Sequence, residues 1–107
     1  MRIPKSLKLM GHTVKVECLP PAKWKQKECV GYFNPRDMKI AVLKRPGTGT
    51  EHAFTHELTH AMLYCMGHAL YEDEQFVDTL GGLLHQAMNS AKYPEPLQPR
   101  RPRKTKA

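Results

Sequence analysis

The chain has 107 residues, of which 40% are hydrophobic, and a formal net charge of +7. This length predicts one small domain with a modest core, which a bound metal ion would help to stabilise. No stretch is apolar enough for a membrane span or a secretory signal, and the three cysteines (Cys18, Cys29 and Cys65) lack motif spacing. We therefore expect a protein of a reducing cytoplasm, its own or that of a host cell, without membrane contact.

Three strands are predicted in the N-terminal half of the chain. Residues 13–17 alternate and include β-branched side chains, so they predict a first strand, which ends at Pro20 and Pro21. Residues 29–33 and 38–43 predict two further strands. The Asn-Pro-Arg-Asp sequence between them is a strong turn signal, so these two strands should form an antiparallel hairpin.

The segments around these strands carry weaker signals. Residues 3–8 show no clear period, and we expect a lead-in without regular structure. Residues 22–28 are a polar connection in which Trp24 should lie against the sheet. A loop with one proline and two glycines follows at 44–49.

A first helix is predicted from Glu51 to Met66. Its N-cap is Thr48, which would form a capping box with Glu51, or alternatively Thr50. Gly67 is a natural left-handed terminator. The helical spacing predicts a core face made of five residues: Phe54, Leu58, Ala61, Met62 and Cys65.

A second helix should begin near Glu72 or Asp73 and end near Ala91, because acidic residues favour a helix N-terminus. Two adjacent glycines in its middle, Gly81 and Gly82, weaken it and are explained by close packing on the first helix. Its predicted apolar face has seven members: Phe76, Val77, Leu80, Leu83, Leu84, Ala87 and Met88. These elements predict an α+β domain at residues 1–93, with a small antiparallel sheet of about three strands packed on the two helices.

The remaining residues, 94–107, carry a net charge of +4 and are rich in proline. Such a composition predicts a disordered basic tail. Its five cations would permit weak contact with nucleic acid or with acidic partners through phosphate or carboxylate groups: Arg100, Arg101, Arg103, Lys104 and Lys106.

The sequence His-Glu-Leu-Thr-His at residues 56–60 is the strongest functional signal. Side chains four residues apart lie on one face of a helix, one turn from each other, which is the separation that two ligands of one tetrahedral zinc ion need. His56 and His60 are therefore candidate ligands. Glu57, beside the first ligand, is placed to take a proton from a zinc-bound water.

A catalytic zinc ion needs a third protein ligand. We select Glu74, in the first turn of the second helix, with Asp78 on the same face as a hydrogen-bond acceptor for a ligand imidazole. Three residues remain alternatives to Glu74 as third ligand: Glu72, Asp73 and His68.

The two motifs, His-Glu-x-x-His on one helix and Glu-x-x-x-Asp on the next, resemble those of the gluzincin metallopeptidases. Over residues 11–90 the order of strand, hairpin and two helices is similar to minimal gluzincins of the ImmA/IrrE-like and phage-encoded type. The resemblance implies a peptidase in which His56, His60 and Glu74 bind zinc, Glu57 is the general base and Asp78 supports a ligand. No position matches by motif the His or Tyr that stabilises the oxyanion in larger members.

The resemblance also implies a substrate, a protein or peptide that would pair with an edge strand beside the first helix. Residues 29–33 or 38–43 are the candidates for that edge. The competing hypothesis is a non-catalytic, zinc-stabilised binding module that uses the basic tail for nucleic acid or an acidic partner.

Four further residues have simpler interpretations. His52 is expected to be exposed in the first helical turn, although it could line the cleft. His85 lies about 16 Å along the helix from Glu74, too far to act at the metal. Tyr64 and Tyr71 could approach a substrate, but packing is the default role of such residues.

Overall fold

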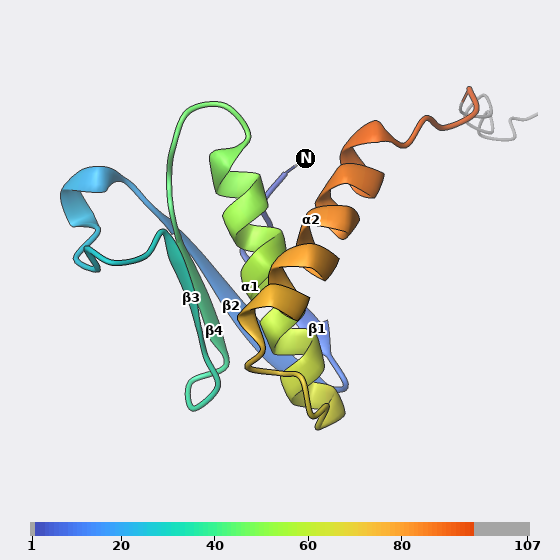
Figure 1. Cartoon of the computed structure of the whole chain (residues 1–107). Helices are drawn as coiled ribbons and strands as arrows, with labels where there is room; N and C mark the ends of the chain where they lie inside the picture. Colours follow the sequence, from blue (N-terminus) through green and yellow to red (C-terminus); the bar gives the residue numbers. More distant parts are fainter. Residues whose placement is uncertain (1, 96–107) are drawn as a thin grey trace, which may run out of the picture.

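Four β-strands and two long α-helices make up the fold, so the predicted α+β class is confirmed. The computed structural model describes residues 2–95 (Figure 1). Helix α1 contacts β3 and β4 of the sheet and also α2, so it has neighbours on two sides. None of the helices in these residues is long and apolar enough to cross a membrane.

The sheet has four strands rather than three and is mixed rather than antiparallel. Its strands are β1 (Ser6–Leu9), β2 (His12–Leu19), β3 (Gly31–Asn34) and β4 (Lys39–Leu43), in the order β1-β2-β4-β3. The added strand, β1, falls where the sequence predicted an irregular lead-in. It is held by antiparallel pairing with β2 and not by a hydrophobic period of its own.

The parallel pair is β2 and β4. The chain leaves β2 through a one-turn helix (Pro21–Lys23), reaches the sheet edge as β3, and returns antiparallel to it as β4. Strand β4 therefore lies inside the sheet, and the prediction that 38–43 could be a free edge is wrong. Strand β3 is the outer strand on this side.

The predicted hairpin between β3 and β4 is present. Its turn is fixed by Asn34, whose Oδ1 accepts hydrogen bonds from the amides of Arg36 (2.9 Å) and Asp37 (3.2 Å). Trp24 packs on Tyr32 of β3, with ring centroids 5.9 Å apart, and its indole N–H donates to the carbonyl of Cys29. The connection before β3 is thus tied to the sheet, as predicted for Trp24.

The core lies between the sheet and α1. Alternate residues of β2 and β4 are buried with one face of α1, in a cluster of seven: Val14, Val16, Ile40, Val42, Ala53, Phe54 and Ala61. Each fully buried Val, Ile or Phe side chain contributes about 1.5–3 kcal/mol. This cluster fixes α1 against β2 and β4.

Helix α1 spans Gly49–Met66 and begins two residues before the predicted start. Thr48 is its N-cap residue but makes no side-chain capping bond, so the predicted capping box is wrong. The Thr50 hydroxyl instead bonds the backbone of Arg45. Gly67 ends the helix in the left-handed region, at φ 65°, as predicted.

Helix α2 spans Glu74–Ser90, and its N-cap is Asp73, whose carboxylate accepts from the amide of Phe76 at 2.9 Å. Only part of its predicted apolar face is covered, because α2 lies on α1 and not in a closed core. Val77 and Gly81 are buried. Leu80, Leu83 and Met88, also on this predicted apolar face, are exposed.

Candidate metal centre

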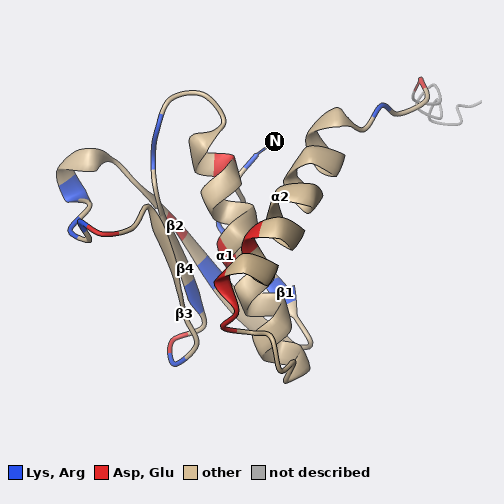
Figure 2. Ribbon diagram, viewed as in Figure 1, with Lys and Arg blue, Asp and Glu red and all other residues tan. Residues whose placement is uncertain are grey.

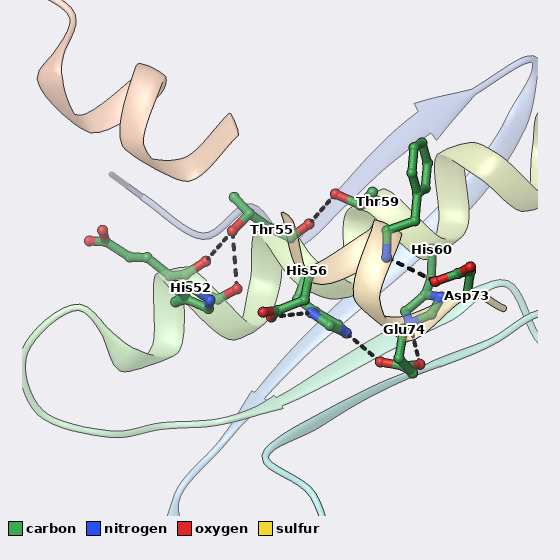
Figure 3. A network of polar contacts seen from close by, with 10 residues as sticks. His52, Thr55, His56, Thr59, His60, Asp73 and Glu74 are labelled. Carbon is green, nitrogen blue, oxygen red and sulfur yellow. Dashed lines mark hydrogen bonds and ion pairs between the residues drawn. The ribbon is translucent and has the colours of Figure 1, made fainter. Parts of the chain in front are cut away.

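Two histidines and a glutamate meet where α2 begins beside α1 (Figure 3). The helical repeat places His56 and His60 one above the other, with ring centroids 5.0 Å apart. Among the residues that the structure describes, the single group of three or more metal-ligating side chains with donor atoms within 4.8 Å of one another is His56, His60 and Glu74.

The turn after α1 brings Glu74 to the histidines. The amide of Gly67 donates to the carbonyl of Tyr64, and that of His68 donates to the carbonyl of Leu63, both at 2.9 Å. These bonds satisfy the last carbonyls of α1 and reverse the chain within a few residues. The thirteen positions between His60 and Glu74 are therefore enough for the return.

The carboxylate of Glu74 lies across both imidazoles. Its Oε1 is 3.1 Å from Nε2 of His56, and its Oε2 is 3.0 Å from Nε2 of His60. The carboxylate is well exposed, whereas both rings are largely buried, so solvent reaches the cluster from the side of Glu74.

The other nitrogen of each ring is also held. Nδ1 of His56 lies 3.3 Å from Oδ1 of Asp78, and Nδ1 of His60 lies 2.9 Å from the main-chain carbonyl of Tyr71. Both partners are acceptors, so the tautomer with its proton on Nδ1 would donate to each of them and leave Nε2 of both rings available to bind a cation. Outer partners of this kind orient metal-ligating histidines in known sites.

In that tautomer, the lone pair of each Nε2 faces an oxygen of Glu74 at about 3 Å, and the ligand atoms of all three residues lie within 4.8 Å of one another. Such acceptors repel unless a cation lies between them. Protonating both rings would place two positive charges side by side, whereas one divalent ion satisfies all three groups. At zinc bond lengths of about 2.0–2.2 Å, tetrahedral ligand atoms lie about 3.3 Å apart, which is close to the spacing present.

Glu57 lines the same cleft as these three residues and packs against Gly31 of β3. It is only 8% exposed, and burial raises the pKa of its carboxyl group, with Glu74 adding to the rise and His56 and His60 opposing it. A Cβ atom on Gly31 would lie 3.3 Å from Cγ of Glu57, so glycine leaves the space that this side chain occupies.

A cleft of about 800 Å³ runs between β3 and the two helices. Its walls include the whole cluster, with Glu57, Asp78 and Tyr71, together with β3 residues Gly31 to Phe33. The Tyr71 ring packs edge-on against His60, with centroids 6.0 Å apart. Burial raises the pKa of the Tyr71 phenol, and Glu72, Tyr64 and Glu57 add to the rise, so it stays a protonated donor.

The alternative third ligands have other surroundings. Asp73 caps α2. His68 stacks on Phe76, with rings 5.9 Å apart, and its Nδ1 accepts from the amide of Leu70. Glu72 lines the cleft, but it does not belong to the three-residue ligand group.

The remaining predictions concern His52, His85 and the tail. His52 is exposed and also lines the cleft. His85 lies 3.3 Å from Glu51 and so belongs to the contact between the two helices. The five cations of the predicted tail all fall in 96–107, outside the described residues.

Two contributors to the site were not predicted from the sequence. The carbonyl of Tyr71 is a main-chain group, and no side-chain pattern signals it. In the sequence Gly31 looks like any other strand glycine. Its role becomes clear only from the packing of α1 against it. Comparison of the chain with protein-family models, curated proteins and solved structures gave no match, so the site is interpreted from its own geometry.

Proposed function

We propose that the protein is a zinc-dependent metallopeptidase. His56, His60 and Glu74 would hold the ion, and Glu57 would be the general base. The observation that carries this proposal is the convergence of two imidazoles and a carboxylate, with Nδ1 of His60 hydrogen-bonded to the carbonyl of Tyr71 and Nδ1 of His56 3.3 Å from the carboxylate of Asp78. The nearby buried carboxyl group of Glu57 adds a base in the same cleft.

When bound, zinc supplies Lewis acidity that activates a water molecule and polarises a peptide carbonyl. Glu57 takes a proton from the attacking water and passes it to the departing amine. The raised pKa of Glu57 brings the carboxyl group closer to the range in which it can both accept and release a proton. The Tyr71 phenol is the neutral donor in the cleft and would stabilise the negative charge that develops on the carbonyl oxygen.

The free edge of β3 suits an extended peptide. The amide of Leu43 donates to the carbonyl of Val30, so in the antiparallel ladder Val30, Tyr32 and Asn34 point their backbone groups toward β4. Gly31 and Phe33 then point theirs toward the free edge of the sheet, and both residues line the cleft. A substrate strand can pair with these two residues while its scissile carbonyl lies near Glu57.

The test compares wild type with Glu57→Gln. Both proteins should bind one zinc ion per chain, measured by elemental analysis after gel filtration. The substrate is a peptide that wild type is found to cleave in a peptide mixture. On this peptide, kcat/KM of the variant should be at least about 10²-fold lower than that of wild type, because the variant lacks the base. Equal cleavage by the two proteins would contradict the role of Glu57, and zinc binding without any hydrolysis would favour the binding-module hypothesis.

A further inference from the structure

Arg45 closes the end of the cleft at which α1 begins. Among the described residues that line the cleft, it is the only lysine or arginine. One terminal nitrogen of its guanidinium donates to the carbonyl of Gly49 at 2.8 Å. Its Nε is buried and has no hydrogen-bond partner in the described part of the chain, so the guanidinium is only partly satisfied.

The position of this guanidinium is fixed on two sides. Thr50 holds the backbone of Arg45, because its Oγ1 accepts from the amide at 2.8 Å and donates to the carbonyl at 3.1 Å. Gly49 leaves room for the side chain: a Cβ atom there would lie 2.9 Å from Cζ of Arg45 and 3.0 Å from Nε. The loop is thus shaped around the cation.

The opposite wall of the cleft is acidic. Four carboxyl groups line the region around the candidate metal centre: Glu57, Glu72, Glu74 and Asp78. In Figure 2 they belong to the red segments where α1 and α2 meet, whereas the blue segment of the loop before α1 includes Arg45. These carboxylates repel a negatively charged substrate group, whereas Arg45 attracts one.

The distance between the Arg45 end of the cleft and the candidate metal ligands determines which residue of a bound peptide would meet Arg45. Gly49 lies about nine residues of α1 before the level of the metal ligands, which corresponds to about 13 Å. An extended chain advances about 3.3 Å per residue, so the Arg45 end is about four residues from the scissile bond.

The direction follows from β3. Gly31 lies against Glu57, and Phe33 packs on Tyr64 further along α1, so β3 runs in the same direction as α1. A substrate strand antiparallel to β3 therefore runs toward Arg45, with its C-terminal side at that end.

Building on the proposed function, we infer that Arg45 binds a carboxylate of the substrate three to four residues on the C-terminal side of the scissile bond. The carboxylate is either an Asp or Glu side chain or the C-terminus of the peptide. A guanidinium offers paired donors that match the two oxygens of either group.

The experiment measures binding, so that it does not depend on hydrolysis. Zinc-loaded Glu57→Gln protein is titrated into fluorescein-labelled decapeptides that differ by a single Asp or Asn placed at each position in turn. A second set compares a free C-terminus with an amide at each length. Asp should bind about tenfold more tightly than Asn at one position, as expected for one charge-assisted hydrogen bond.

Three additional substitutions identify the residue responsible. Arg45→Gln should reduce the Asp-to-Asn affinity ratio to about one. Gly49→Ala keeps the charge but displaces the guanidinium, and should reduce the ratio several-fold. Lys44→Gln is the matched control, because it removes an exposed cation next to Arg45 that does not line the cleft, and it should keep the full ratio.

The outcomes separate the two proposals. A ratio of about one at every position in the Arg45-containing protein, or no binding by any peptide, overturns the carboxylate subsite. An Asp preference on the N-terminal side overturns the antiparallel seating. The Glu57→Gln protein could show the expected Asp preference while wild type cleaves none of these peptides. That result would contradict the peptidase proposal alone.

Discussion

Gly31 of β3 and Glu57 of α1 pack together so closely that a Cβ atom on Gly31 would lie 3.3 Å from Cγ of Glu57. The same atom would lie 3.3 Å from the carbonyl oxygen of Ala41 and from Cγ1 of Val42. Strand β4 thus prevents an added Cβ atom from shifting toward it, so the side chain of Glu57 is the group that must move.

Gly31→Ala should therefore displace Glu57 by a few tenths of an ångström while leaving the metal ligands in place. We expect kcat to fall about tenfold, because small misplacements of reacting groups lower rates strongly. Zinc content and melting temperature, measured on the same samples, should stay within error of wild type. A wild-type kcat would show that Glu57 has more freedom than this contact allows.

Asp78 is predicted to act through His56. Its carboxylate lies 3.3 Å from Nδ1 of His56 and so would favour the tautomer in which Nε2 faces the proposed ion. Asp78→Ala should weaken zinc binding about 10- to 100-fold, as is usual when such partners are removed. Competition with a chromophoric chelator measures this affinity. Thr79→Ala, at the adjacent exposed position of α2, is the control and should bind zinc as wild type does.

The part of the site that lies on α1 could be predicted, because a helix fixes the relative position of side chains four residues apart. Glu74 and Asp78 follow the same rule on α2, and the structure brings both beside His56. What a periodic rule cannot give is the path of the turn between helices. That path decides that the carbonyl of Tyr71, and not a side chain, bonds His60.

The strand order was harder to predict for a related reason. Residues 6–9 form β1 through bonds to β2, and four residues are too few to show a period. The parallel pairing of β2 with β4 joins segments that lie more than twenty residues apart. The apolar stripe of α2 correctly predicts that the segment is helical. It does not predict how much of the stripe is buried, because that depends on the shape of α1.

The two glycines of α2 should respond in opposite ways to alanine. A Cβ atom on Gly81 would lie 3.2 Å from Cα of His56 and from Oγ1 of Thr59, so the predicted close approach of the helices occurs at Gly81. At Gly82 the nearest atom, in His52, is 4.0 Å away. Gly82 is therefore the control position, because a Cβ atom added there would make no close contact with α1.

Gly81→Ala should push α2 away from α1, destabilise the protein by about 1–3 kcal/mol and weaken zinc binding, since Glu74 moves with α2. Gly82→Ala should stabilise the protein by up to about 1 kcal/mol through helix propensity alone. Urea unfolding of both zinc-loaded variants measures the difference. Equal effects at the two positions would contradict the packing described.

Stability in acid should depend on Glu51, which links α1 to the far part of α2. Hydrogen bonds from Asn89 and His85 lower the pKa of the Glu51 carboxyl group, and burial opposes them only in part. A lowered pKa in the folded state means that the ionised group stabilises the fold above its unfolded pKa, and that this contribution is lost as the pH falls through the folded pKa. The loss should therefore fall in acid, below pH 4.5, which is the ordinary pKa of a glutamate carboxyl group.

The free energy of unfolding of wild type should exceed that of Glu51→Gln near neutral pH, and the difference should shrink across that acid range. Taking the difference cancels the titration of groups common to both proteins, including the histidines of the metal centre. Asn89→Ala removes the leading donor to Glu51 and should reduce the amplitude of the change. Glu28→Gln, which removes an exposed carboxyl group from the loop before β3, is the charge-matched control and should keep the wild-type profile. A difference between wild type and Glu51→Gln that stays constant from pH 7 to pH 3 would mean that these hydrogen bonds do not favour the ionised carboxylate.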